Sequence, residues 1–173
     1  NAVWEYEATH GLYSLGVFRQ EQSLDKYDIP KDSVLTTESE TDGALLGADV
    51  LLSQTFGLAA KYRYLEDNNL TDPTIDRKEH LVIVGLRHQN ANGFSAGITQ
   101  TFRKIEFEDN TRKDEDIPIT DIDMLYEFRD KAATVGLQVN NIFDEQFNWV
   151  TDQFVFVGRN PAREFLVTGR LNF

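Results

Sequence analysis

The sequence predicts an all-β protein, an antiparallel meander of about nine strands. Apolar and polar residues alternate in one stretch after another of the 173-residue chain, and this period of two places successive side chains on opposite faces of a strand. Short turn signals and long polar connections separate these stretches. The longest apolar run, 81–86, is far shorter than the ~18 residues of a transmembrane helix.

Four strands are predicted in the first half of the chain. The first places Trp4 and Tyr6 opposite Glu5, and a turn at Gly11 leads into the second. The fourth alternates most cleanly, with tyrosines on one side and basic residues on the other. The four predicted ranges are 3–8, 12–22, 43–53 and 56–66.

Five further strands are predicted in the second half. Asn92-Gly93 is a dipeptide that closes hairpins, and it joins the first two of them. The last strand alternates up to the final residue. The five predicted ranges are 78–89, 94–107, 120–129, 132–140 and 163–173.

The connections between these strands alternate in length. Those near residues 10, 54, 91 and 130 are short, whereas long acidic loops are predicted near 23–42, 67–77, 108–118 and 143–162. Short turns at one end and long loops at the other are typical of transmembrane β-barrels. We therefore expect residues 3–173 to be part or all of a transmembrane outer-membrane β-barrel, with 1–2 a cloning remnant and the whole a fragment of a longer protein.

Composition excludes several classes of function. The net charge of -12 argues against a nucleic-acid partner, because a polyanion would be repelled. The chain has no cysteine and therefore no disulfide or thiolate metal site. His80 and His88 share strand parity, but no third ligand stands at a fitting spacing, so we expect neither a metal site nor a cofactor. The acidic loops are expected to be solvated charge runs rather than calcium sites.

Charged residues on the predicted strands lie opposite the apolar set, and alternation alone does not decide which face meets solvent. Aromatic residues near the strand ends of the apolar face favour a barrel with interfacial girdles, whereas a soluble β-barrel that binds an apolar ligand is the alternative. In the membrane barrel the charges line a lumen; they are Lys61, Arg63, Arg87, Arg103, Asp121, Asp123, Glu127, Arg129 and Arg170.

The carboxylates among these charges could act as acid and base. Pairing of Asp121, Asp123 and Glu127 with arginines of neighbouring strands, such as Arg103, explains them equally well, and we expect no enzymatic activity. Aromatic residues of the last long loop are candidates for ligand contact, because binding residues often lie on loops of a rigid scaffold. They are Phe147, Trp149, Phe154 and Phe156. Packing of this loop onto the mouth of the barrel is the alternative explanation for these aromatic residues.

The terminal strand resembles the last strand of bacterial outer-membrane barrels, because it alternates and stops on an aromatic residue. One of its faces consists of Phe165, Val167, Gly169, Leu171 and Phe173. In that family the terminal strand is the assembly signal, so the resemblance implies the barrel-insertion machinery and outer-membrane lipid as partners.

Two stretches resemble TonB-dependent outer-membrane receptors. Residues 139–147, VNNIFDEQF, are similar to the "NLFDxxY" segment at the end of the penultimate strand, and 158–163, GRNPAR, to the "PxR" start of the final strand. The resemblance implies the outer membrane of a Gram-negative bacterium and uptake of a scarce nutrient such as a ferric siderophore. It also implies a missing amino-terminal plug and missing barrel strands; the ligand is not identified. A barrel for assembly or secretion is the related alternative.

Overall fold

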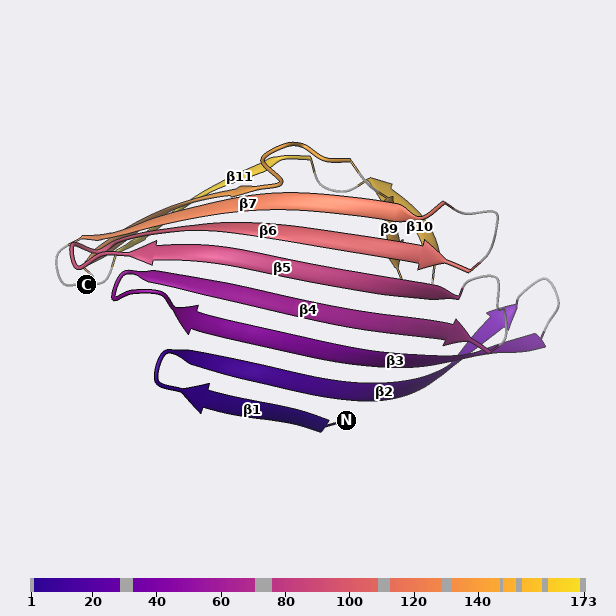
Figure 1. The fold of residues 1–173 in the computed structure, drawn as a ribbon. Helices are drawn as coiled ribbons and strands as arrows, with labels where there is room; N and C mark the ends of the chain where they lie inside the picture. Colours follow the sequence, from indigo (N-terminus) through magenta and orange to yellow (C-terminus); the bar gives the residue numbers. More distant parts are fainter. Residues whose placement is uncertain are drawn as a thin grey trace.

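The computed structural model describes residues 2–28, 33–70, 76–108, 113–128, 132–146, 148–151, 154–159 and 162–171. Nine strands form one antiparallel sheet in the order β1-β2-β3-β4-β5-β6-β7-β8-β11, and β9 and β10 form a separate hairpin (Figure 1). The strands are β1 Ala2–Ala8, β2 Gly11–Asp28, β3 Ser33–Leu51, β4 Phe56–Asn69, β5 Arg77–Gln89, β6 Phe94–Phe107, β7 Glu115–Phe128, β8 Ala133–Asn140, β9 Asn148–Thr151, β10 Phe154–Arg159 and β11 Glu164–Leu171. The predicted nine-stranded antiparallel meander is confirmed.

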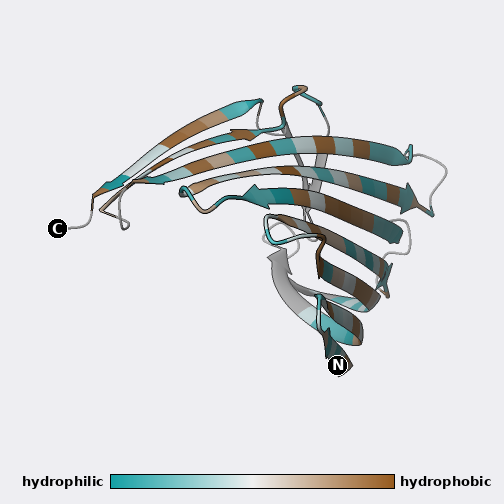
Figure 2. Ribbon diagram, turned by 60° about the vertical axis from the view of Figure 1, so that its left-hand side comes forward, coloured by the Kyte–Doolittle hydropathy of each residue, from teal (hydrophilic) through white to brown (hydrophobic). Residues whose placement is uncertain are grey.

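The sheet is open in the residues that the structure describes. It curves along its length (Figure 2), and its two edges are β1 and β11, each of which pairs with one neighbour only. No described segment is a helix long and apolar enough to cross a membrane. An open edge presents unpaired backbone N–H and C=O groups, so both edges can accept a further strand.

Continuous registers fix which side chains share a face of the sheet. Tyr62, Val82 and Phe102 lie directly opposite one another on β4, β5 and β6, and they define the outer face. Lys61, Ile83 and Thr101 are their neighbours of opposite parity and define the inner face. The period-two pattern of the sequence therefore becomes two chemically different surfaces.

Large hydrophobic side chains of the outer face are exposed from one edge of the sheet to the other. They include Trp4, Leu15, Leu46, Val84, Leu86, Ile98, Met124, Leu137, Phe165 and Val167. By contrast, the buried hydrophobic side chains of the described part, Ile105 and Ile117, both lie on the inner face. A soluble barrel would bury the apolar face, so this arrangement favours lipid as its surroundings.

Three of the four predicted long loops are wrong in extent. β2 and β3 remain paired as far as Asp28 and Ser33, so much of 23–42 is a regular hairpin, and 67–77 and 108–118 are likewise shortened by β4, β5 and β7. The cause is physical: where both faces of a hairpin meet water, no apolar alternation is needed, yet the backbone ladder still forms. The fourth loop, 143–162, contains β9 and β10.

Candidate functional site

A buried carboxylate bridges two arginines on the inner face of the sheet. Glu79 of β5 is 2% exposed, and its Oε1 and Oε2 accept hydrogen bonds from Arg63 Nη2 of β4 at 2.9 Å and Arg103 Nη2 of β6 at 2.7 Å. We call this group the Arg63–Glu79–Arg103 triad. A carboxylate so deeply buried requires such partners, because an unpaired buried charge is strongly destabilising.

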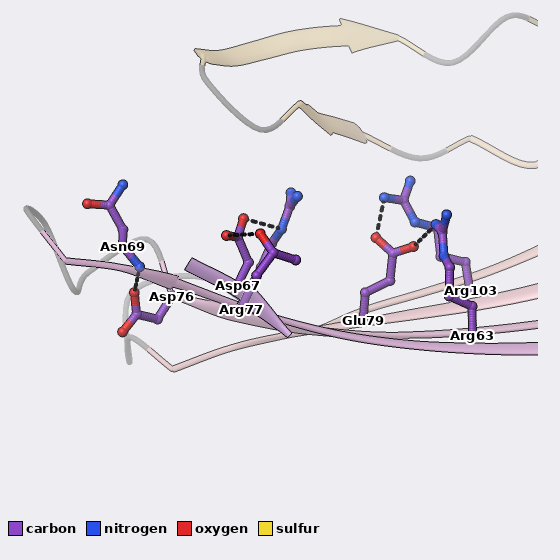
Figure 3. A network of polar contacts seen from close by, with 8 residues as sticks. Arg63, Asp67, Asn69, Asp76, Arg77, Glu79 and Arg103 are labelled. Carbon is purple, nitrogen blue, oxygen red and sulfur yellow. Dashed lines mark hydrogen bonds and ion pairs between the residues drawn. The ribbon is translucent and has the colours of Figure 1, made fainter. Parts of the chain in front are cut away.

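A second polar cluster continues along the same face toward the strand ends (Figure 3). Asp67 Oδ2 lies 3.6 Å from Arg77 Nε, and Asp67 Oδ1 accepts a hydrogen bond from Thr41 Oγ1. The backbone N–H of Asn69 donates to Asp76 Oδ1 at 2.6 Å. In Figure 3 the β9–β10 hairpin lies on the side toward which the triad points. These contacts tie β3, β4, β5 and β6 together across the inner face.

The other half of the inner face is hollowed. A hollow of about 790 Å³ is bordered by Asp49, Lys61, Arg87 and Asp123, and a second of about 410 Å³ shares Arg87 and Asp123 with it. The floor of the larger hollow is low because four residues there have little or no side chain, namely Gly57, Ala59, Gly85 and Gly97. The inner face is therefore filled near the triad and open toward the short turns.

The charges predicted to line a lumen share the inner face where they are described. Register places Lys61, Arg63, Arg87, Arg103, Asp121, Asp123, Glu127 and Arg170 there, while Arg129 lies outside the described residues. Placement on one face is what a lumen requires. That this face borders water inside a closed barrel stays a prediction.

The expected pairing of Arg103 with the carboxylates of β7 is wrong. Arg103 Nη2 binds Glu79 on the opposite side, whereas Asp121 Oδ1 accepts a hydrogen bond from the backbone N–H of Asn141 at 2.8 Å. The residue that faces Arg103 on β7 is Ile117, which offers no charge. The registers of β5 with β6 and of β6 with β7 determine which residue pairs with Arg103, because strand parity alone does not fix which residues lie opposite one another.

Asn141 forms a buried corner where β8 ends. Its φ is 51° and its side chain both donates to and accepts from the backbone of Glu145, at 2.9 Å and 3.0 Å. Asp144, with a φ of 58°, accepts a hydrogen bond from the backbone N–H of Arg163, just before β11. The segment that resembles "NLFD" thus turns the chain and attaches it to the start of the final strand.

Aromatic side chains border the apolar band of the outer face at both ends. Tyr62 and Tyr64 lie on either side of His80 at one end, and the ring of Phe56 packs against that of His88 at the other, tilted by 38° with ring centroids 4.5 Å apart. Eight residues separate the two histidines, which is about 27 Å along a strand and roughly 20 Å across a membrane once a tilt of about 40° is applied. Beyond His80 the outer face is charged, as in the ion pair of Lys78 with Glu108.

The remaining predicted residues lie at or beyond the limits of the described part. Phe147 and Phe173 lie outside it, and Trp149, Phe154 and Phe156 belong to β9 and β10, whose side chains are not described. On β11, Phe165, Val167 and Leu171 are exposed on the outer face, and nothing approaches the Cβ position of Gly169. Ligand contact and the assembly signal both stay predictions.

Sequence reasoning missed Glu79, Arg77 and Asn141. The signal for the first two was present: continuing the parity of Arg87 backwards along β5 reaches Glu79 and then Arg77. Glu79 lies inside the predicted strand 78–89 on the same face as Arg87, and Arg77 lies one residue before the predicted start of that strand. The sequence shows Asn141 only as part of the segment that resembles the receptor family, because a positive φ and a buried amide are not visible in sequence.

No protein family and no curated protein match this sequence. Two solved structures match the fold: OmpT expressed in the outer membrane of Vibrio cholerae, with a TM-score of 0.68 and 11% identity, and in-vitro folded OmpT, an outer-membrane protein of Vibrio cholerae in its trimer form, with a TM-score of 0.64 and 12% identity. Each alignment covers 96% of this chain and 53% of the matched chain, so this chain spans about half the length of those structures. The likeness confirms the outer-membrane β-barrel fold, and the outer membrane of a Gram-negative bacterium is the location that belongs to this fold.

Proposed function

We propose that this chain is a wall of an outer-membrane barrel that moves small polar solutes across the membrane. One observation carries the proposal: a single set of strands presents an exposed apolar outer face bordered by aromatic rings and an inner face with fixed charges. Lipid suits the first surface and a hydrated lumen suits the second. The soluble alternative would bury the apolar face and is disfavoured.

The more specific proposal is energised uptake of a scarce nutrient such as a ferric siderophore by a TonB-dependent receptor. Its support is the resemblance of 139–147 and 158–163 to segments of that family, and 139–146 includes a structured corner at Asn141. This proposal includes ligand contact by Phe147, Trp149, Phe154 and Phe156, and recognition of the terminal strand by the barrel-insertion machinery. An outer-membrane barrel for assembly or secretion is equally compatible with the fold.

We infer that closing the barrel needs further strands at both edges, from the rest of the same protein or from a second copy. The unpaired edges of β1 and β11 support this inference. Residues 1–173 alone should then associate or aggregate. A monodisperse monomer in light scattering would contradict the inference.

The expected absence of enzymatic activity also stays a proposal. Asp121 is engaged by the backbone of Asn141, which makes it a poor general base, and this supports a structural role. Loss of a hydrolytic activity upon Asp123→Asn, with folding intact, would contradict it.

The test of function compares solute entry into cells that do and do not produce the full-length protein. Ferric siderophores and small charged nutrients are offered, and entry should be faster when the protein is present. Equal rates for every solute would contradict a transport function. Dissipating the proton gradient then distinguishes energised uptake from passive entry, because energised uptake should stop whereas passive entry should continue.

A further inference from the structure

The charges of the inner face are segregated by strand. In the described residues of β4, β5 and β6 the inner face carries five cations and two carboxylates: Lys61, Arg63, Arg77, Arg87 and Arg103 against Asp67 and Glu79. The described side chains of β1, β2 and β3 contribute only carboxylates there, Glu5, Glu7 and Asp49. β7 likewise contributes Glu115, Asp121, Asp123 and Glu127 and no cation. A basic strip thus crosses a chain whose net charge is -12.

The two carboxylates of the strip do not neutralise it. Among the described residues, Glu79 pairs with Arg63 and Arg103 at once and Asp67 pairs with Arg77, so two carboxylates meet three of the five cations. Arg63 also stays 45% exposed, so its guanidinium has N–H donors directed to the inner side. The triad therefore holds the partly exposed guanidinium of Arg63 in a fixed position on the inner face.

Lys61 and Arg87 add two charges that form no ion pair with any described residue. Both border the larger hollow of about 790 Å³, whose floor is lowered by glycine and alanine, while Glu7, Asp49 and Asp123 of the flanking strands lie on its rim. A carboxylate or phosphate group that enters this hollow would meet cations that already lie there, without first displacing a protein carboxylate from them.

We propose that the inner face of β4, β5 and β6 is a binding strip for anionic solutes that carry carboxylate or phosphate groups. The proposal rests on the proposed function, because it requires the inner face to border water. The acidic surfaces on β1–β3 and β7 restrict anions to this strip and repel them from its flanks.

Charged thiol reagents test the potential of the strip directly. The chain has no cysteine, so Thr101→Cys reports on the strip and Ser14→Cys, directly opposite Glu5, reports on the acidic flank. The full-length protein, with any cysteine outside residues 1–173 replaced by serine, is labelled in vesicles with an anionic and a cationic methanethiosulfonate, and the ratio of the two rates is measured. We expect the anionic reagent to be faster at position 101 and the cationic reagent to be faster at position 14.

Removing one charge gives the matched comparison. Lys61 lies on the same face as Thr101, about 10 Å away across two strand spacings, so Lys61→Gln should lower the ratio at position 101 about twofold. Lys104 lies on β6, the strand of Thr101, but on the outer face, so Lys104→Gln should leave the ratio of labelling rates at position 101 unchanged. Faster labelling of position 101 by the cationic reagent would contradict the anion-binding strip but not the transport function. Equal effects of Lys61→Gln and Lys104→Gln on the ratio would do the same. No reaction at either cysteine in the folded protein overturns the water-lined inner face as well.

Discussion

At the residue scale, the buried carboxylate of Glu79 stabilises the positive charges of Arg63 and Arg103 on the inner face. Without its carboxylate, Arg63 and Arg103 face each other across β5 with no shared counter-charge. We expect Glu79→Ala to lower the free energy of unfolding by about 2 kcal/mol, below the usual loss for a fully buried pair because Arg63 is partly exposed. Urea titration of the full-length protein in lipid vesicles measures the loss.

The matched control is Glu106→Ala, which breaks an exposed ion pair with Lys104 on the outer face. Such pairs contribute little, so the unfolding midpoint should hardly move. Equal shifts for Glu79→Ala and Glu106→Ala would show that burial of the triad does not matter.

Asn141 combines a positive φ with two side-chain hydrogen bonds to the backbone of Glu145, and different substitutions separate the two contributions to stability. Asn141→Gly keeps the positive φ but loses two side-chain hydrogen bonds, at about 1 kcal/mol each. Asn141→Ala also places an ordinary residue in the left-handed region, which costs about 1 kcal/mol more. The expected order of unfolding free energies is wild type, then Gly, then Ala.

Asn140→Ala provides the control at the neighbouring position, because the hydrogen bonds of Asn140 to Glu164 and Gln138 are exposed. Asn140→Ala should lower the free energy of unfolding by less than either substitution of Asn141 does. An alanine variant of Asn141 that is as stable as the glycine variant would contradict a role for the backbone conformation.

At the scale of elements, the β2–β3 hairpin extends well past the apolar band. Its ladder continues through Gln22 and Ser39 to Asp28 and Ser33, although the sequence there is polar. We expect the amides of residues 20–25 to exchange hydrogen slowly, because each ladder bond must open first. Mass spectrometry of exchange measures this, and rates typical of an unstructured loop would contradict the extended hairpin.

The elements also show how far sequence reasoning reached. Strand positions and faces within the apolar band were predicted, because Tyr62, Val82 and Phe102 alternate with polar neighbours and lipid enforces that alternation. Outside the band lipid no longer enforces the alternation, so β2, β3 and β7 were predicted too short at the ends that lie there. Partners such as Glu79 for Arg103 depend on register, which parity leaves open.

The candidate site was predicted in its residues but not in its arrangement. Lys61, Arg63, Arg87 and Arg103 were assigned to one face from the sequence. Their gathering on β4–β6, with carboxylates on the flanking strands, follows only when the strand order is known. The turn at Asn141 depends on a backbone angle that local composition does not encode.

At the scale of the whole molecule, the two faces must meet two different solvents. A membrane-spanning wall has lipid against the outer face of every strand in the sheet and water against the inner face once the barrel is closed. Alternation in the sequence fixes the faces but not their surroundings, so the surroundings have to be measured.

Spin labels along β6 measure them most directly. In vesicles containing the full-length protein, labels replacing Ile98 and Phe102 should be more accessible to oxygen, which dissolves in lipid, and labels replacing Thr99 and Thr101 should be more accessible to a water-soluble nickel chelate. For a membrane-spanning wall we expect this alternation of oxygen and nickel access, with a period of two residues. Nickel access at all four positions, or oxygen access at none, would contradict a membrane-spanning wall.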